Sequence, residues 1–281
     1  MDNNTVIGVD LGGSNAFVAR VRGHEIEDTY LQDISARSTR ETVMDELIYS
    51  IDQVMSADVK GLGIGVPGLV EHATGMVYDV VNIPSWKEVA LKKLLEEKFK
   101  RPVFLNNDAN CFAMGEYYFG QNQKYSDLVG LIIGTGLGAG IVLDGNIYNG
   151  ANGGAGEFGM LPYLDHNYEY YASGQFFSHQ YGRSGKDLFQ KANAGDKEAL
   201  HIFAEFGFHL GKAIMAIVYA LDPEIIILGG SVSKAFPYFE EFMWKSFKEF
   251  EYQQALRNLQ IKVMSNEYIP VLGAAALVAT S

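Results

Sequence analysis

A strand–glycine turn–strand unit occurs twice in this chain, and this recurrence constrains the fold more than any other sequence feature. The first unit covers residues 6–21, with a turn at residues 11–14, and the second covers residues 128–143, with a turn at residues 134–138. In both, two apolar runs flank a short glycine-containing segment, which is typical of two strands joined by a tight turn. A pair so far apart predicts two similar halves and not an array of short repeats.

Between and after these units, apolar periodicity predicts further strands and helices. The expected helices cover residues 39–55, 86–99, 109–119, 196–221 and 271–280, and the expected strands cover residues 60–66, 102–105, 224–228 and 260–264. A glycine-rich loop is expected at residues 149–159, followed by a loop-rich stretch. In α/β sheets ligands gather where strands run into helices. The polar cluster at residues 106–108 stands at such a point.

Composition narrows the class of protein. With 281 residues and 48% hydrophobic residues, the chain can bury a large core. The net charge of −12 gives no general attraction for nucleic acid or anionic membranes, so neither is expected as a partner. The single cysteine, Cys111, excludes an internal disulfide and a cysteine-rich zinc cluster. No leader segment and no run of about 20 apolar residues is apparent, so we expect a cytoplasmic protein.

Both glycine turns carry groups suited to phosphate. In the first, Asp10 could hold Mg²⁺ directly or through water, while Gly12 and Gly13 let a phosphate approach the backbone and Ser14 can donate to it. An ordinary hairpin turn explains any one such segment equally well. A second turn with a hydroxyl, Thr135, favours two turns that clamp a triphosphate. The chain has no G-x-x-x-x-G-K-[ST] sequence, which excludes a P-loop.

Carboxylates and amides in polar loops are candidates for a sugar site. Asn107 can hold a polyol and Asp108 can accept the proton of an attacking hydroxyl, although both residues are also favoured at a helix N-cap. Glu157 and Glu169 are further candidates for sugar hydroxyls. The histidines show no metal-ligand spacing. The aromatic stretch at residues 168–177 could line a sugar site or belong to the core, but we expect it on a dimer surface.

In their order along the chain, these motifs resemble those of the ROK (repressor, open reading frame, kinase) family. The likeness runs over nearly the whole sequence. The matching segments are residues 10–15, 65–68, 82–86, 107–110, 134–140, 150–159 and 228–231.

The resemblance implies an α/β, actin-like ATPase (ribonuclease H-like) fold of two similar α/β domains with a cleft between them. Their expected extents are residues 1–109 with 270–281, and residues 110–269. It also implies that Asp108 is the general base and that the protein is a homodimer. The implied sugar ligands are Asn82, Asn107, Glu157, Glu169 and Gly68. The implied ATP ligands are Asp10, which also binds Mg²⁺, with Gly12, Gly13, Ser14, Asn15, Gly134, Thr135, Gly136, Gly229 and Gly230.

Two departures from the family pattern bear on the substrate. Met160 stands where the family has a histidine that binds sugar and zinc, and the cysteine-rich zinc loop is missing, so no zinc is expected. Repressors of the family carry a helix-turn-helix segment before the first phosphate motif. Only residues 1–4 precede the first strand here, so DNA binding is not expected.

The sequence therefore predicts an ATP-dependent kinase that phosphorylates the 6-hydroxyl of a glucose-like hexose. Two alternatives stay open. One is a kinase for an N-acetylhexosamine such as N-acetylglucosamine or N-acetylmannosamine. The other is a sugar-sensing regulatory protein with weak or no turnover, which Met160 and the missing zinc loop suggest.

Overall fold

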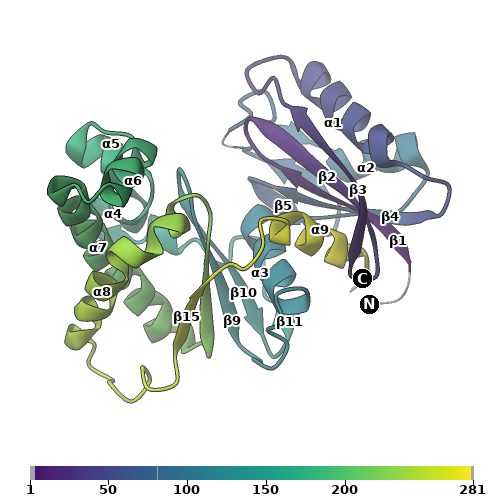
Figure 1. Cartoon of the computed structure of the whole chain (residues 1–281). Helices are drawn as coiled ribbons and strands as arrows, with labels where there is room; N and C mark the ends of the chain where they lie inside the picture. The colour runs from purple at the N-terminus through teal and green to yellow at the C-terminus, as the bar shows by residue number, and fades with distance from the viewer. Residues whose placement is uncertain (1–3, 81, 280–281) are drawn as a thin grey trace. The chain divides into compact units, whose positions relative to one another are not determined.

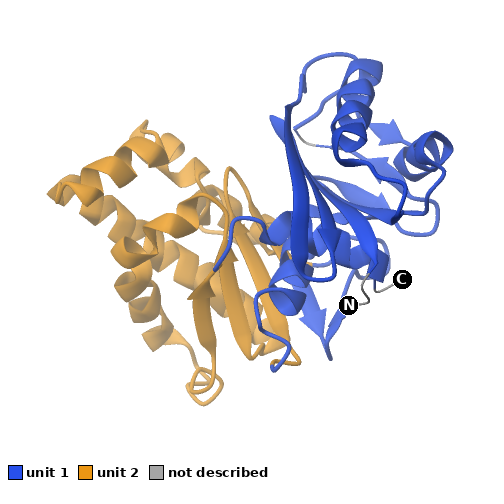
Figure 2. Ribbon diagram, turned by 45° about the vertical axis from the view of Figure 1, so that its right-hand side comes forward, with its two compact units in different colours: residues 1–124, 140–155, 265–281 blue, residues 125–139, 156–264 orange. Residues whose placement is uncertain are grey.

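The computed structural model describes residues 4–80 and 82–279. They form two compact units, shown in blue and orange in Figure 2. Unit 1 comprises residues 1–124, 140–155 and 265–281, and unit 2 comprises residues 125–139 and 156–264. These units differ in extent from the domains expected above, because the helix after residue 107 and the segment 140–155 belong to unit 1. The division into domains at residues 109 and 270 stays a prediction.

Unit 1 is built on a five-stranded sheet with the order β3-β2-β1-β4-β8. Its strands are β1 (Thr5–Leu11), β2 (Asn15–Arg22), β3 (Glu25–Asp33), β4 (Val59–Val66) and β8 (Val103–Asn107). The first three form an antiparallel meander, while β4 and β8 run parallel to β1. The other elements are α1 (Arg40–Val54), α2 (Leu91–Phe99), α3 (Asp108–Tyr118), α9 (Ile269–Ala279), β11 (Asn146–Ile147) and a small sheet of β5 (Leu69–Glu71), β6 (Met76–Tyr78) and β7 (Glu88–Val89).

Helices cover both faces of this sheet (Figure 1). The core on one face contains Val43, Leu47 and Ile51 of α1, and this helix begins at the side-chain cap of Thr39. On the other face, α9 lies directly on β1 and β4. A Cβ added at Gly63 would lie 1.8 Å from the Ala274 carbonyl oxygen, so glycine is needed for this close approach.

Unit 2 contains the first strand and the glycine turn of the second hairpin, together with a largely helical layer. The second sheet has the order β11-β10-β9-β14-β15, so its strands follow one another in the chain in the same way as those of the first sheet. The boundary between the units passes through β10. Its further strands are β9 (Leu128–Ile133), β10 (Leu137–Leu143), β14 (Ile225–Gly229) and β15 (Gln260–Val263). The remaining elements are β12 (Pro162–Tyr163), β13 (His166–Asn167), α4 (Tyr168–Ala172), α5 (Gln175–Tyr181), α6 (Gly185–Asn193), α7 (Lys197–Leu221), α8 (Phe236–Ser246) and the 3₁₀ turns η1 (Phe158–Met160), η2 (Val232–Ala235) and η3 (Phe247–Glu249).

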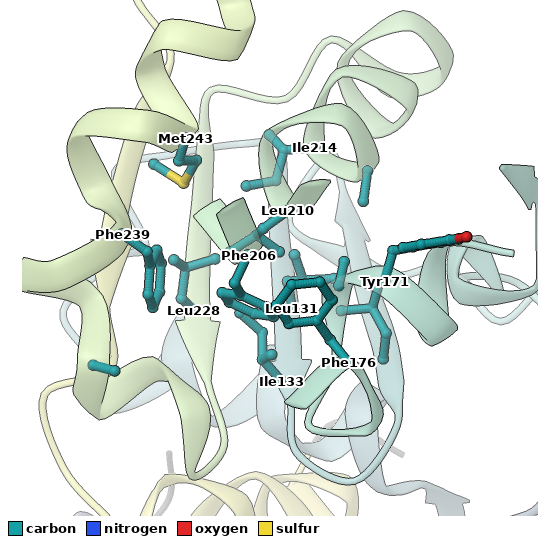
Figure 3. Packing of buried hydrophobic residues seen from close by; sticks show 14 of the residues in the cluster. Leu131, Ile133, Tyr171, Phe176, Phe206, Leu210, Ile214, Leu228, Phe239 and Met243 are labelled. Carbon is teal, nitrogen blue, oxygen red and sulfur yellow. The ribbon is translucent and has the colours of Figure 1, made fainter. Parts of the chain in front are cut away.

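Helix α7 forms the centre of the unit 2 core. Its Phe206, Leu210 and Ile214 point toward Leu131 of β9 and Phe239 of α8 in Figure 3. In the described part of the chain, α7 is the one helix long and apolar enough to cross a membrane, but 67% of its most apolar stretch is buried within the structure. The length and apolar character of α7 are therefore explained by its place in this core.

Three expectations about local structure were wrong. The helix expected at residues 86–99 begins only at Leu91, because residues 88–89 form β7 and pair with β6. The stretch after residue 159 is not loop-rich, since it contains β12, β13 and helices α4 to α6. The aromatic stretch does not form a surface as a whole: Tyr171, Phe176 and Phe177 are buried in the core of unit 2.

Candidate active site

In unit 1 the candidate residues gather at the carboxyl ends of three parallel strands. Asp10 of β1 pairs with Gly65 of β4, and Gly65 pairs in turn with Asn106 of β8. Asp108 follows two residues after Asn106, so both predicted carboxylates lie at the same edge of the sheet. Both carboxylates act on the buried Cys111 thiol. The pKa of this thiol is raised mainly by burial and further by the charges of Asp10 and Asp108.

Asp10 is half-buried at the end of β1. Burial raises the pKa of its carboxyl group to about 6, since the surrounding protein disfavours the charged form. A divalent cation held on the phosphates of a nucleotide would offset this cost, and Mg²⁺ prefers oxygen ligands such as this carboxylate. The chemistry of Asp10 therefore fits the predicted magnesium site.

The first glycine turn packs closely on Asn82. Gly12 donates its backbone N–H to the Asn15 carbonyl oxygen at 2.8 Å, which closes the turn. A Cβ added at Gly13 would lie 2.2 Å from the Asn82 Cβ. Ser14 and Asn15 are exposed at the tip of the turn. The fold thus brings a predicted sugar ligand and the first predicted phosphate turn into contact.

Asn107 and Asp108 are placed by the junction of β8 and α3. The Asn107 Oδ1 accepts from the Ala109 N–H at 2.9 Å and is the N-cap of α3, so the capping role considered from the sequence is real. Its Nδ2 donates to the Gly68 carbonyl oxygen at 3.3 Å, which joins two predicted sugar-site residues. Asp108 is the first residue of α3 and stays partly exposed.

A buried amide network behind this junction was not found from the sequence. Asn106 accepts on its Oδ1 from the Asn107 N–H at 2.8 Å and from the Asn110 Nδ2 at 2.8 Å. The Oδ1 of Asn149 accepts from both Asn106 (3.0 Å) and Asn110 (3.1 Å). The network ties the start of the glycine-rich loop to the segment that carries Asp108. The three asparagines at residues 106, 107 and 110 were its only sequence signal.

In unit 2 the second glycine turn is held by the segment between α4 and α5. The Gly134 N–H donates to the Gly136 carbonyl oxygen at 3.0 Å within the turn. Outside it, the Gly174 N–H donates to the Gly134 carbonyl oxygen at 2.7 Å, and the Ser173 Oγ donates to the Thr135 carbonyl oxygen at 3.0 Å. These bonds fix the backbone of the predicted phosphate turn.

Glu169 lies against the same turn and close to Glu157. Its Oε2 accepts from the Leu137 N–H at 3.0 Å, and its Oε1 accepts from the Gln175 Nε2 at 2.9 Å. The pKa of Glu157 is raised by partial desolvation and then by repulsion from the Glu169 carboxylate. Unit 2 therefore brings both predicted sugar-binding glutamates near each other.

A cavity of about 600 Å³ opens beside the second turn. Gly134, Thr135 and Ser231 line it, together with two lysines that sequence reasoning missed, Lys186 and Lys234. Gly229 and Gly230 lie next to it at the end of β14. Gly230 has a φ of +81° and faces the Ile133 backbone, so a side chain there would be strained. The size of the cavity suits a nucleoside.

Met160 ends the 3₁₀ turn that follows Glu157, and half of its surface is exposed. Its Sδ lies 3.9 Å from the Asn167 Nδ2. The side chain at this position is therefore a large, flexible apolar group on the surface of unit 2, close to both candidate glutamates in the sequence.

Comparison with known proteins explains the order of these motifs. Residues 6–281 match the ROK family. The chain belongs to this family. It is 32% identical to a glucokinase of Halalkalibacterium halodurans (84% of this chain, 82% of the relative) and 30% identical to an N-acetyl-D-glucosamine kinase of Mannheimia succiniciproducens (97% and 99%). It is also 26% identical to the xylose repressor of Bacillus subtilis (97% and 76%).

Solved structures of this family share the fold. The ROK family glucokinase of Streptomyces griseus, determined in complex with glucose and AMPPNP, superimposes with a TM-score of 0.85 at 26% identity. The match covers 99% of this chain and all of that one. The prediction of an α/β, actin-like ATPase fold is therefore confirmed, as is membership of the ROK family.

Proposed function

We propose that this protein is an ATP-dependent sugar kinase that transfers a phosphoryl group to the 6-hydroxyl of a glucose-like hexose. One observation carries the proposal: the Asp10 and Asp108 carboxylates lie at one edge of the unit 1 sheet, where the charges of both act on the Cys111 thiol. One carboxylate for Mg²⁺ and one for the substrate hydroxyl are the two acids that this chemistry needs.

Each candidate residue has a role in this proposal. The candidate sugar ligands of unit 1 are Asn82, Asn107 and the Gly68 backbone, and the candidate sugar ligands of unit 2 are Glu157 and Glu169. The turn at residues 12–15 is the candidate phosphate-binding segment of unit 1, and the turn at residues 134–136 is that of unit 2. The cavity beside Gly229 and Gly230 takes the nucleoside. Mg²⁺ bound with ATP would neutralise developing charge on the phosphates, held directly or through water by Asp10.

Asp108 acts on the sugar hydroxyl. Phosphoryl transfer has a loose transition state, so positioning and charge stabilisation supply most of the acceleration and the proton leaves late. The hydrogen bonds of Asn107 to Ala109 and Gly68 fix the backbone from which the Asp108 carboxylate reaches the substrate. Asp108 thus first orients the hydroxyl and then accepts its proton.

An N-acetylhexosamine is the second candidate substrate. The similarity to a relative named N-acetyl-D-glucosamine kinase supports it, and Met160 offers an apolar surface on which an acetyl methyl group could pack. The third candidate, a sugar-sensing regulator, is supported by the similarity to a xylose repressor. The presence of Asp10, Asp108, Glu157 and Glu169 together favours an enzyme.

The test is an ADP-release assay with glucose, mannose, N-acetylglucosamine and N-acetylmannosamine. Asp108→Asn should lower kcat at least about 10²-fold, the effect typical of losing a general base, while the sugar Kd from calorimetry changes little. Asp52→Asn, which removes an exposed carboxylate of α1, is the matched control. Near-normal turnover of Asp108→Asn refutes the role of Asp108. Sugar binding without turnover by the native protein would favour the sensor.

A cytoplasmic location and a homodimer complete the proposal. Two exposed leucines are candidate contacts for a second copy: Leu161 directly precedes β12, and Leu164 lies in the turn between β12 and β13. Light scattering coupled to gel filtration measures the mass, and a monomer at micromolar concentration contradicts the dimer.

A further inference from the structure

Gln175 contacts two candidate sites of unit 2 at once. It is the first residue of α5 and lines the 600 Å³ cavity together with Gly134 and Thr135. Its side-chain Nε2 donates to the Glu169 Oε1 at 2.9 Å. One residue therefore joins the surface of the nucleoside cavity to the carboxylate proposed to bind the sugar.

Glu169 is joined to the phosphate turn by a second route. Its Oε2 accepts from the Leu137 N–H at the end of that turn. A Cβ added at Gly136 would lie 2.6 Å from this same oxygen, so the carboxylate lies directly against the turn backbone. The orientation of Glu169 thus depends on the conformation of residues 134–137.

The start of α5 is fixed to the turn as well. The Ser173 Oγ donates to the Thr135 carbonyl oxygen and accepts from the Gln175 N–H at 3.1 Å, and Ser173 is fully buried. The Ser173 hydroxyl therefore links the backbone of the turn to the Gln175 N–H, and the Gln175 side-chain amide continues the chain of hydrogen bonds to Glu169.

We propose that Gln175 is a positioning residue through which nucleotide in the cavity strengthens sugar binding at Glu169. The inference rests on the function proposed above. A nucleotide orders the turn and the first residues of α5, and this holds the Glu169 carboxylate in the orientation that accepts from a sugar hydroxyl. By thermodynamic linkage, sugar strengthens nucleotide binding by the same factor.

Calorimetry measures this coupling. The Kd of the sugar with the highest turnover is measured with and without saturating AMPPNP, and AMPPNP should lower it at least about 5-fold in the native protein, within the usual range of such coupling. Gln175→Met keeps a side chain of similar length without the donor. In this variant the factor should fall close to 1. In the kinase assay the sugar KM at saturating ATP should rise while kcat changes little.

Two further variants separate coupling from folding. Gln190→Met changes an exposed glutamine of α6 outside the cavity lining and should keep the native factor. Gln175→Asn keeps an amide that is too short to reach Glu169 and should lose the factor as Gln175→Met does, with both variants still stabilised by AMPPNP in thermal unfolding.

Two results overturn the inference while leaving the kinase intact. These are an unchanged factor in Gln175→Met, or a native protein that binds both ligands independently. A native protein that binds neither ligand refutes the proposed function and this inference with it.

Discussion

Glu116 of α3 is a buried acid that the proposed chemistry does not use, and its replacement by glutamine tests the electrostatics of unit 1. The side chain is 2% exposed. Its Oε2 accepts from the Asn122 Nδ2 at 3.2 Å, and its Oε1 has no hydrogen-bond partner among the described residues. Burial raises the pKa of this carboxyl group to about 7, against a smaller opposing effect of the Ser265 backbone N–H.

The effect on stability follows from the difference between folded and unfolded states. Because the pKa rises from 4.5 to about 7 on folding, the folded protein binds the proton more tightly. The contribution of Glu116 to stability is therefore greatest below pH 4.5, and it falls as the pH rises from 4.5 to about 7. At about 1.4 kcal/mol per factor of ten in proton affinity, the full cost is about 3 kcal/mol, and about 2.5 kcal/mol of it develops between pH 5 and pH 8.

Glu116→Gln removes this dependence because the amide stays neutral. Relative to the native protein, its free energy of unfolding should rise by about 2.5 kcal/mol between pH 5 and pH 8, on top of any constant offset from burying the amide N–H groups. Urea unfolding followed by circular dichroism at several pH values measures the difference.

Glu97→Gln, which changes an exposed residue of α2, is the control and should give a difference that does not vary with pH. A pH-independent difference for Glu116→Gln would refute the assignment of a neutral, buried acid.

Two further predictions concern packing and hydrogen bonding in unit 1. Gly273→Ala should destabilise the protein by more than about 3 kcal/mol in urea unfolding. The reason is that a Cβ would lie 1.7 Å from the Cys111 carbonyl oxygen, where α9 crosses α3. A smaller loss of stability would show that the two helices can move apart. Asn149→Ala should lower the free energy of unfolding by about 1–3 kcal/mol, because it removes an acceptor shared by two buried amides. Asn149→Asp keeps that oxygen, and Asn146→Ala is the control. Equal losses of stability in Asn149→Ala and Asn146→Ala would contradict the network.

Local signals in the sequence were sufficient where a residue acts on its immediate neighbours. The hairpins were found because apolar runs flank glycine turns, and helices α1 and α7 because their apolar residues recur with helical periodicity. Strand β3 escaped detection because it is mostly exposed and carries no apolar run. Helices α4 to α6 were missed because they are short and their burial comes from packing against the unit 2 core.

The sequence by itself determined the family, the order of the motifs and the identity of the candidate acids, because these depend on residue types at fixed spacing. Only the tertiary structure decided what those residues touch. Asn149 is hydrogen-bonded to Asn106, 43 positions away in the sequence, and Leu137 is hydrogen-bonded to Glu169, 32 positions away. Such contacts are made when strands and helices pack, so neither periodicity nor a local motif contains them. The proposed coupling between nucleotide and sugar depends on contacts of this second kind.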